Sequence, residues 1–141
     1  MNAIPCLNLQ KFASGTRAQR HQFVTDLGHA FEEIGFVAIS GHYLTTALKD
    51  ALYEQIRAFF DLPEHVKKKY EIEGGGGQRG YTSFGKEHAK GKKEGDLKEF
   101  WHFGQYAEVV EALKPHYPPN VIVDEIPAFN EVGKATFQAL E

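Results

Sequence analysis

Arg79 and Tyr81 are the first residues whose types and placement could do chemistry. They follow the glycine run at residues 74–77, and such a run predicts a hinge or a loose loop. An arginine there could hold a carboxylate through two parallel hydrogen bonds, with the tyrosine hydroxyl as a further donor. A surface salt bridge is the alternative role of Arg79, and the sequence alone leaves both roles open.

The aromatic segment Phe100-Trp101-His102-Phe103 is the second candidate, and it lies in a predicted strand over residues 98–104. Side chains alternate along a strand, so Phe100 and His102 share one face and Trp101 and Phe103 share the other. One face would pack on helices while the other lines a pocket. A strand that is buried in the core on both faces is the alternative.

Residue context argues against several other chemistries. Gly75-x-Gly77-x-x-Gly80 matches a dinucleotide-binding fingerprint, but it lacks a preceding strand and a following helix. None of the 7 histidines is followed two positions later by a carboxylate, and no two have the spacing of a helical zinc motif. Cys6 has no neighbouring basic side chain to activate its thiol. The sequence therefore predicts no metal site or nucleophile built from this chain alone.

Three longer helices must position these candidates. The first should start at Ser14 or Thr16 as its N-cap and stop at Gly35, and the second should start near Thr45 or Thr46. The third should open at Ile126-Pro127. Their apolar faces, at helical spacing, are Phe23, Leu27, Ala30, Phe31 and Ile34; Leu48, Leu52, Ile56 and Phe59; and Phe129, Val132, Gly133, Thr136, Phe137 and Leu140.

A fourth, short helix is predicted after Asp61, which should cap it with Pro63 just inside and Glu64 completing a capping box. Val66 and Tyr70 should face inward. The three lysines Lys67, Lys68 and Lys69 should point toward water.

Four short strands complete the expected elements. Residues 4–9 predict an edge strand, because Pro5 has no N–H to donate. The four consecutive apolar residues at 36–39 predict a strand buried on both faces. The other two strands are residues 81–84 and 98–104. The expected connections are a solvated loop over residues 86–95 and a connector over residues 115–119.

The chain has 141 residues, 42% of them hydrophobic and 25% charged, which predicts one ordered domain over residues 1–141. A net charge of −3 argues against a general nucleic-acid binder. A single cysteine fits a reducing compartment, and no apolar run approaches the roughly 18 residues of a membrane span. We therefore expect a cytoplasmic protein with no nucleic-acid or membrane partner. The last helix is still periodic at Leu140, so we expect the natural chain to continue; a frayed natural terminus is the alternative.

Five segments carry a family resemblance. They are Ile4-Pro5; Gly35-Phe36-Val37-Ala38-Ile39-Ser40-Gly41-His42; Phe59-Phe60-Asp61-Leu62-Pro63 with Lys67-Lys68-Lys69; Arg79-Gly80-Tyr81 with Gly85-x-Glu87; and Asp96-Leu97-Lys98-Glu99-Phe100, closing at Gly104. In this order they resemble the N-terminal region of iron(II)- and 2-oxoglutarate-dependent dioxygenases of the isopenicillin N synthase type. Ser40-Gly41-His42 departs from the family's usual Asn-His-Gly turn.

The resemblance implies an α+β fold, with helices packed on the first strands of an incomplete double-stranded β-helix (jelly-roll) barrel. The family's His-x-Asp…His iron ligands and Arg-x-Ser 2-oxoglutarate clamp lie further along than residue 141. Residues 1–141 would then be an N-terminal region without catalytic residues, metal ligands or cofactor-binding residues.

The resemblance also implies roles for the candidate residues. By position, Arg79 and Tyr81 look like pocket-rim residues that hold a polar or acidic substrate, and Phe100 and His102 look like pocket-wall residues on a barrel strand. The complete enzyme would use iron(II) and 2-oxoglutarate to hydroxylate or otherwise oxidise a small organic substrate, or omit 2-oxoglutarate as isopenicillin synthase does. The chain alone is expected to bind neither cofactor and to be inactive.

Two alternatives follow from the missing iron ligands: a stand-alone module that binds a ligand or a protein partner, and one half of a split enzyme. The oxygenase interpretation predicts unpaired strand edges, and hence self-association or a missing C-terminal half. The module should instead be a stable monomer or homodimer with its strands covered.

Overall fold

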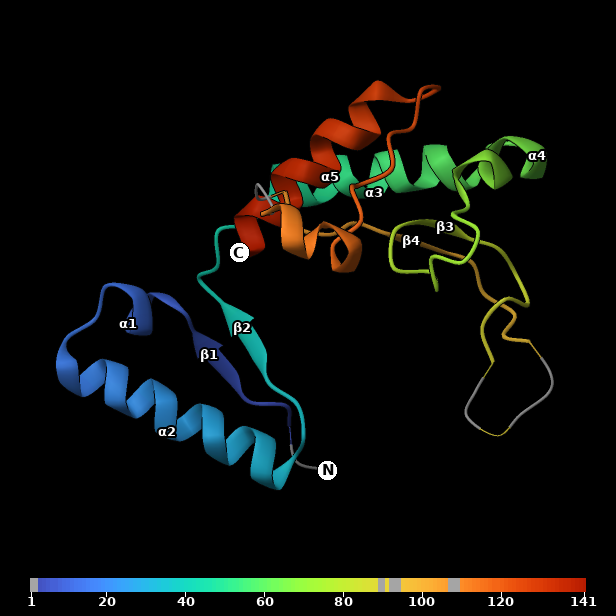
Figure 1. Cartoon of the computed structure of the whole chain (residues 1–141). Helices are drawn as coiled ribbons and strands as arrows, with labels where there is room; N and C mark the ends of the chain where they lie inside the picture. Colours follow the sequence, from blue (N-terminus) through green and yellow to red (C-terminus); the bar gives the residue numbers. More distant parts are fainter. Residues whose placement is uncertain (1–2, 89–90, 92–94, 107–109) are drawn as a thin grey trace. The chain divides into compact units, whose positions relative to one another are not determined.

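The computed structural model describes residues 3–88, 91, 95–106 and 110–141 (Figure 1). Helices and strands are mixed along the chain, which confirms the mixed helix-and-strand class. The chain divides into two compact units, an N-terminal unit up to Thr45 and a second unit from Thr46 to Ala139. One domain over residues 1–141 stays a prediction. No helix in the described part is long and apolar enough to cross a membrane.

The N-terminal unit is built on two short parallel strands. Its elements are β1 (Cys6–Asn8), α1 (Gln10–Ala13), α2 (Arg17–Glu33) and β2 (Ala38–Ser40). Strands β1 and β2 pair in register from Cys6 opposite Ala38 to Asn8 opposite Ser40, and α2 packs against β1. Strand β1 lies inside the segment predicted as a strand.

Helix α2 begins and ends where the sequence predicts. Thr16 is its N-cap: the Thr16 hydroxyl accepts the Gln19 N–H at 3.3 Å, and the Gln19 side chain accepts the Thr16 N–H at 2.8 Å. This reciprocal pair satisfies two backbone donors that the first turn would leave free. Gly35 follows the helix with a φ of 81°, a conformation that glycine adopts at no steric cost. Ser14, the other predicted cap, ends the short helix α1 instead.

The prediction that residues 36–39 form a strand buried on both faces is wrong. The strand begins only at Ala38, and the Phe36 side chain is 68% exposed. Among the described residues β2 pairs with β1 alone, so this two-stranded sheet cannot bury a continuous apolar run. Phe31, predicted on the buried face of α2, is likewise 56% exposed, whereas Phe23 and Ala30 are buried.

The second unit holds the remaining elements and an antiparallel pair of strands. In chain order the elements are α3 (Thr46–Phe60), α4 (Glu64–Lys67), the 3-10 helix η1 (Lys68–Tyr70), β3 (Gly80–Thr82), β4 (Phe100–His102), the 3-10 helix η2 (Glu111–His116) and α5 (Pro127–Leu140). Tyr81 lies opposite Trp101 in the β3–β4 pair. Apart from η2, which the sequence did not predict, these elements agree in type with the predicted helices and strands, although both strands are shorter than predicted.

Aromatic side chains form the core of the second unit. Phe59 of α3 and Phe129 of α5 stack with ring centroids 5.1 Å apart, and Trp101 of β4 meets Phe59 edge-on at 4.7 Å. Gly133 of α5 lies against the Phe103 ring so closely that a Cβ there would overlap it. Trp101 and Phe103 therefore share the core-facing side of β4, as the strand alternation predicts.

Three expectations about helices α4 and α5 are wrong. The N-cap of α4 is Pro63 with no capping side chain, so the predicted capping box with Asp61 is wrong. Val66 and Tyr70 do face inward, but Lys67 is buried rather than solvated. Leu140, predicted on the apolar face of α5, is exposed.

The two predicted connections are met in part. In the segment predicted as a solvated loop, the described residues 86–88 and 91 are exposed, and His88 bridges to Gly95. Residues 89–90 and 92–94 lie outside the described residues. The predicted connector over residues 115–119 overlaps the end of η2.

Candidate functional site

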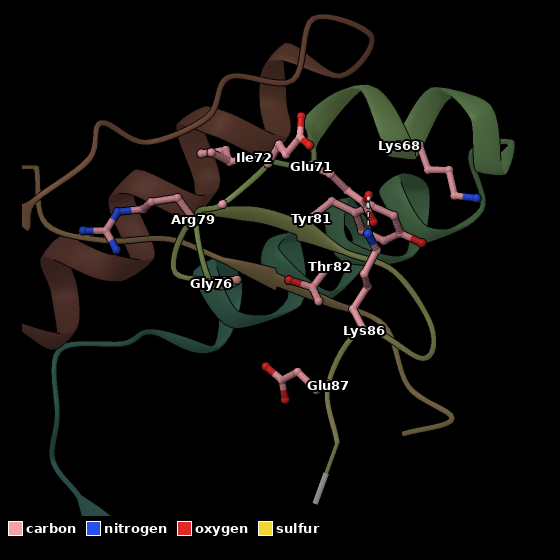
Figure 2. A pocket seen from close by; sticks show the side chains of 12 residues that line it. Lys68, Glu71, Ile72, Gly76, Arg79, Tyr81, Thr82, Lys86 and Glu87 are labelled. Atoms are coloured by element: carbon pink, nitrogen blue, oxygen red, sulfur yellow. Dashed lines mark ion pairs between the residues drawn. The ribbon is translucent and has the colours of Figure 1, made fainter. Parts of the chain in front are cut away.

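A cavity of about 570 Å³ lies beside the segment that joins η1 to β3 (Figure 2). Arg79 and Tyr81 both line it, together with backbone of the glycine run. Its charged lining residues are Lys68, Glu71, Glu73, Arg79, Lys86 and Glu87. The wall is therefore strongly polar, which suits a small polar ligand better than an apolar one.

Two ion pairs already occupy part of this charged lining. The Lys68 ammonium nitrogen lies 2.6 Å from a carboxylate oxygen of Glu64. Glu71 accepts the Ser83 N–H at 3.0 Å and lies 3.8 Å from Lys86, the pair drawn dashed in Figure 2. Because these charges are balanced within the protein, they are less available to a ligand than Arg79.

Arg79 precedes β3 and its guanidinium contacts neutral oxygens. One terminal nitrogen donates to the Gln78 carbonyl at 2.7 Å, and the other donates to the Gln105 side-chain oxygen at 3.0 Å. Its Nε is buried without a hydrogen-bond partner. Among the described residues, no carboxylate lies within ion-pair distance of Arg79, so the surface salt bridge considered from the sequence is not formed there.

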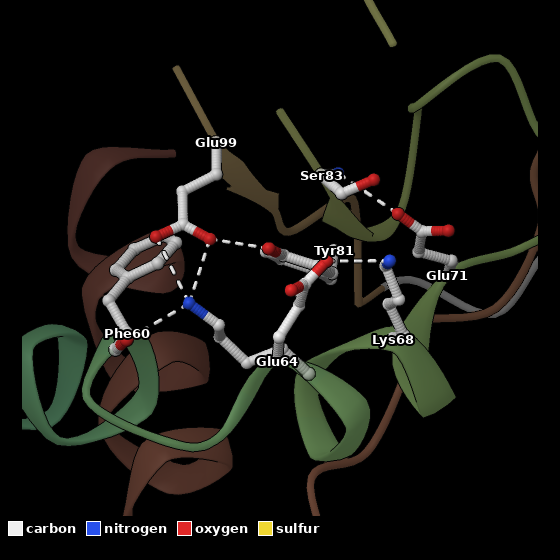
Figure 3. A network of polar contacts seen from close by, with 8 residues as sticks. Phe60, Glu64, Lys68, Glu71, Tyr81, Ser83 and Glu99 are labelled. Atoms are coloured by element: carbon white, nitrogen blue, oxygen red, sulfur yellow. Dashed lines mark hydrogen bonds and ion pairs between the residues drawn. The ribbon is translucent and has the colours of Figure 1, made fainter. Parts of the chain in front are cut away.

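Tyr81 is 2% exposed, and its hydroxyl donates to the Glu99 carboxylate (Figure 3). Burial, together with the neighbouring Glu99 carboxylate, raises the pKa of Tyr81 far above its ordinary value. The hydroxyl proton is therefore held by the protein itself.

Lys67 completes a buried polar cluster with Glu99 and Tyr81. Its ammonium donates to both Glu99 carboxylate oxygens, at 2.9 and 3.1 Å, and to the Phe60 carbonyl at 3.0 Å. The cluster ties the end of α3, helix α4 and strand β3 to the residue before β4. Sequence reasoning missed Lys67, although its position three residues before the inward-facing Tyr70 gave a usable signal.

Phe100 and His102 share one face of β4, with ring centroids 5.8 Å apart. The Lys98 ammonium lies 4.8 Å from the centre of the Phe100 ring. Neither aromatic residue is among those that line the cavity. The structure thus brings Arg79 and Tyr81 together at the cavity, and holds Phe100 and His102 on the adjoining strand.

No three His, Cys, Asp or Glu side chains within residues 3–88, 91, 95–106 and 110–141 lie close enough to hold a metal ion. The donor set needed for iron is therefore not assembled by the described residues. The described residues therefore supply no metal centre, and at the cavity they place an arginine whose hydrogen-bond acceptors are neutral oxygens.

A comparison with protein families matches residues 4–125 to a family described as "non-haem dioxygenase in morphine synthesis N-terminal". Among curated proteins, the chain is 32% identical over 114 residues to 2-oxoglutarate-dependent dioxygenase frbA of a Dothideomycetidae species, covering 72% of this chain and 34% of that protein. It is 33% identical over 85 residues to 2-oxoglutarate-dependent dioxygenase imqE of Aspergillus flavus, covering 60% of this chain and 23% of that protein. The chain thus spans about a third or less of the length of these relatives.

This chain is also similar to solved structures. A 2OG-Fe(II) oxygenase family protein from Caulobacter crescentus superposes with a TM-score of 0.78 at 36% identity, over 99% of this chain and 44% of that chain. A full-length Neurospora crassa protein in complex with alpha-KG superposes with a TM-score of 0.73 at 19% identity, over 99% of this chain and 41% of that chain. The second likeness is evidence for the fold alone.

Proposed function

Since the chain belongs to the family of non-haem dioxygenase N-terminal regions, we propose that it serves as this part of an iron(II)- and 2-oxoglutarate-dependent oxygenase. The complete enzyme would hydroxylate or otherwise oxidise a small organic substrate in the cytoplasm. The observation that carries the proposal is the superposition of 99% of this chain on the Caulobacter crescentus protein at 36% identity.

In this proposal, β3 and β4 are the first strands of a jelly-roll barrel. Their core-facing residues support this role, because Tyr81 and Trp101 both contact Phe59 of α3. Helices α3 and α5 would then hold the strand pair from one side through Phe59 and Phe129. The opposite face, which carries Phe100 and His102, is left free to form a pocket wall.

Arg79 would bind an anionic group of the substrate. Its guanidinium carries a full positive charge, and its described partners are neutral oxygens. A carboxylate could pair with it through charge-assisted hydrogen bonds. Tyr81 would contribute from the cavity wall through its ring, because its hydroxyl is held by Glu99.

Iron and 2-oxoglutarate, when bound in the complete enzyme, would supply the oxidising chemistry. The described residues do not fit an iron site, so this chain's part would be to support the strands and to bind and orient the substrate. The alternatives of a stand-alone module and a split enzyme have no observation in their favour beyond this lack of ligands.

A chimera tests the proposal. Residues 1–141 replace the matching region of the Caulobacter crescentus protein, and iron(II)-dependent conversion of 2-oxoglutarate into succinate is measured beside the intact parent. We expect a folded chimera that forms succinate at a rate comparable with that of the parent.

A chimera that is monodisperse and has the parent's circular-dichroism spectrum, yet forms no succinate while the parent does, would overturn the proposal. If the fused chain does not fold, the 141-residue chain is supplied separately to the remaining part of the parent. Restored succinate formation then supports the proposal, and none contradicts it.

A further inference from the structure

Arg79 is held in place without losing its charge. Arg79 is half-buried, and both hydrogen-bond acceptors of Arg79 are amide oxygens, from Gln78 and Gln105. A guanidinium has five N–H donors; the two terminal nitrogens of Arg79 each donate one hydrogen bond, and its Nε–H is buried without a partner. A guanidinium that is held in place and has unused N–H donors can bind an oxyanion through charge-assisted hydrogen bonds.

Gly104 makes room for this guanidinium. A Cβ at position 104 would overlap the Arg79 Cζ, Nη2 and Nε atoms, so the flat guanidinium lies directly against the Gly104 backbone. The φ of Gly104 is not in the left-handed region. A glycine at position 104 therefore allows the close approach of the Arg79 guanidinium, and the backbone conformation does not itself need a glycine.

Asn120 fixes the backbone on which Arg79 lies. Its side-chain oxygen accepts the Gly104 N–H at 2.6 Å, and its side-chain nitrogen donates to the carbonyls of Gly104 at 3.0 Å and Gln105 at 3.2 Å. These contacts hold both the surface under the guanidinium and the residue whose side chain accepts from it. A distant part of the chain, just before α5, thus sets the position of Arg79.

We propose that Gly104, Gln105 and Asn120, the Arg79 seat, hold the Arg79 guanidinium for a carboxylate-bearing ligand, with Asn120 as a positioning residue. The proposal rests on the proposed role of Arg79 in substrate binding and names the ligand class as carboxylates. Preorganisation of this kind raises affinity because the ordering entropy of the side chain is lost before binding.

Asn130 provides a matched control for Asn120. Its side chain makes the same kind of contact in the same unit, accepting the Val123 N–H and donating to the Val123 carbonyl, both at 2.8 Å. Loss of either asparagine removes one backbone-fixing amide. Asn120 alone is connected to Arg79.

The test uses the full 141-residue chain with isotope-labelled arginine side chains, observed by NMR. The Arg79 Nε–H signal is assigned by its loss in Arg79→Lys. We expect that signal to be rigid and slow to exchange in the wild type and in Asn130→Ala, and mobile in Asn120→Ala and Gly104→Ala. Acetate should shift it saturably in the wild type, at least about threefold more weakly in the two seat variants, and neutral acetamide should not shift it.

An Arg79 signal that is equally rigid in the wild type, Asn120→Ala and Gly104→Ala would overturn the seat, whatever acetate does. A seat that behaves as expected but with no acetate response would overturn the carboxylate assignment and leave the positioning intact. If Asn120→Ala does not fold, Gly104→Ala decides, because the flexible end of Arg79 can move away from an added methyl group.

Discussion

Lys67 and Glu99 form the most buried ion pair among the described residues, with side chains 9% and 16% exposed. Removing two charges from water is costly, so such a pair is not by itself evidence of net stability. Removal of one partner is a different matter, because it leaves the other charge buried and unpaired. Of the three lysines at 67–69, Lys67 is therefore the one whose loss we expect to destabilise the protein most.

Replacing Lys67 by Met should destabilise the protein by about 3 kcal/mol, because the Glu99 carboxylate would remain buried with only the Tyr81 hydroxyl as donor. Lys68→Met is the matched control: Lys68 is exposed and its pair with Glu64 is screened by water, so its loss should change the stability far less than the loss of Lys67. Urea unfolding at neutral pH measures both. Equal losses in the two variants would contradict the buried role of Lys67.

The raised pKa of Tyr81 predicts a loss of stability in alkali. Near pH 10, the ordinary pKa of about 10, tyrosine in the unfolded chain begins to lose its proton while folded Tyr81 keeps it. The unfolded state then binds fewer protons, and the free energy of unfolding falls as pH rises. Tyr70, whose pKa is also raised by burial, adds to the same slope.

Tyr81→Phe should flatten part of this alkaline slope, since phenylalanine has no proton to lose. It should also cost about 1–2 kcal/mol at neutral pH, because Glu99 loses a hydrogen-bond donor. The measurement is urea unfolding at intervals from neutral pH to about pH 11, with the exposed Tyr53→Phe as control. An unchanged slope in Tyr81→Phe would show that Tyr81 ionises alike in both states.

For the helices, the spacing of apolar residues and the residues at the helix ends predicted where α2 and α5 lie. The capping of α2 by Thr16 and its end at Gly35 depend on residues that are neighbours in the chain, so they can be predicted from the sequence. The start of α5 at Pro127 follows in the same way. Burial was less predictable, because it depends on partners: residues 36–39 look like a doubly covered strand, but β2 has one neighbouring strand among the described residues.

The candidate site shows the same division. Arg79 and Tyr81 were found from their types and neighbours, and they do lie at one cavity. The residues that hold them were not found, because Glu99, Gln105 and Asn120 act across 16 to 32 positions of chain, Asn120 through backbone groups. Long-range contacts of this kind leave no periodic pattern in a sequence.

The packing of α5 gives a test at the element scale. Gly133→Ala should destabilise the protein by about 1 kcal/mol or more, because the added methyl group overlaps the Phe103 ring and overpacking outweighs the gain in helix propensity. Gly28→Ala in α2 is the control, since nothing lies within 4 Å of the added Cβ. It should stabilise by about 0.5–1 kcal/mol.

Thermal unfolding of the two variants measures this difference. A stabilised Gly133→Ala would mean that Phe103 does not pack against α5, and the pocket-facing assignment of the opposite side of β4 would lose its support.

At the scale of the whole molecule, strand edges matter most. Each described sheet has two strands, so each strand is paired on one side only. Unpaired edges and exposed apolar side chains such as Phe36 and Leu97 favour association between copies. This pattern is what the oxygenase interpretation expects and what a stand-alone module would avoid.

The 141-residue chain should therefore self-associate as its concentration rises. Light scattering across a concentration series measures this, with the folded chimera described above as the control that should remain a single species. A small, sharply defined species at every concentration would instead favour the stand-alone module.

We propose that this chain forms part of an iron(II)- and 2-oxoglutarate-dependent oxygenase. Calorimetry of 2-oxoglutarate binding to the native protein, purified from its source cells, tests it most directly because no substrate need be known. We expect saturable binding when iron(II) is present, and loss of that binding when a chelator removes the metal. A folded, iron(II)-supplemented native protein that binds no 2-oxoglutarate would contradict it.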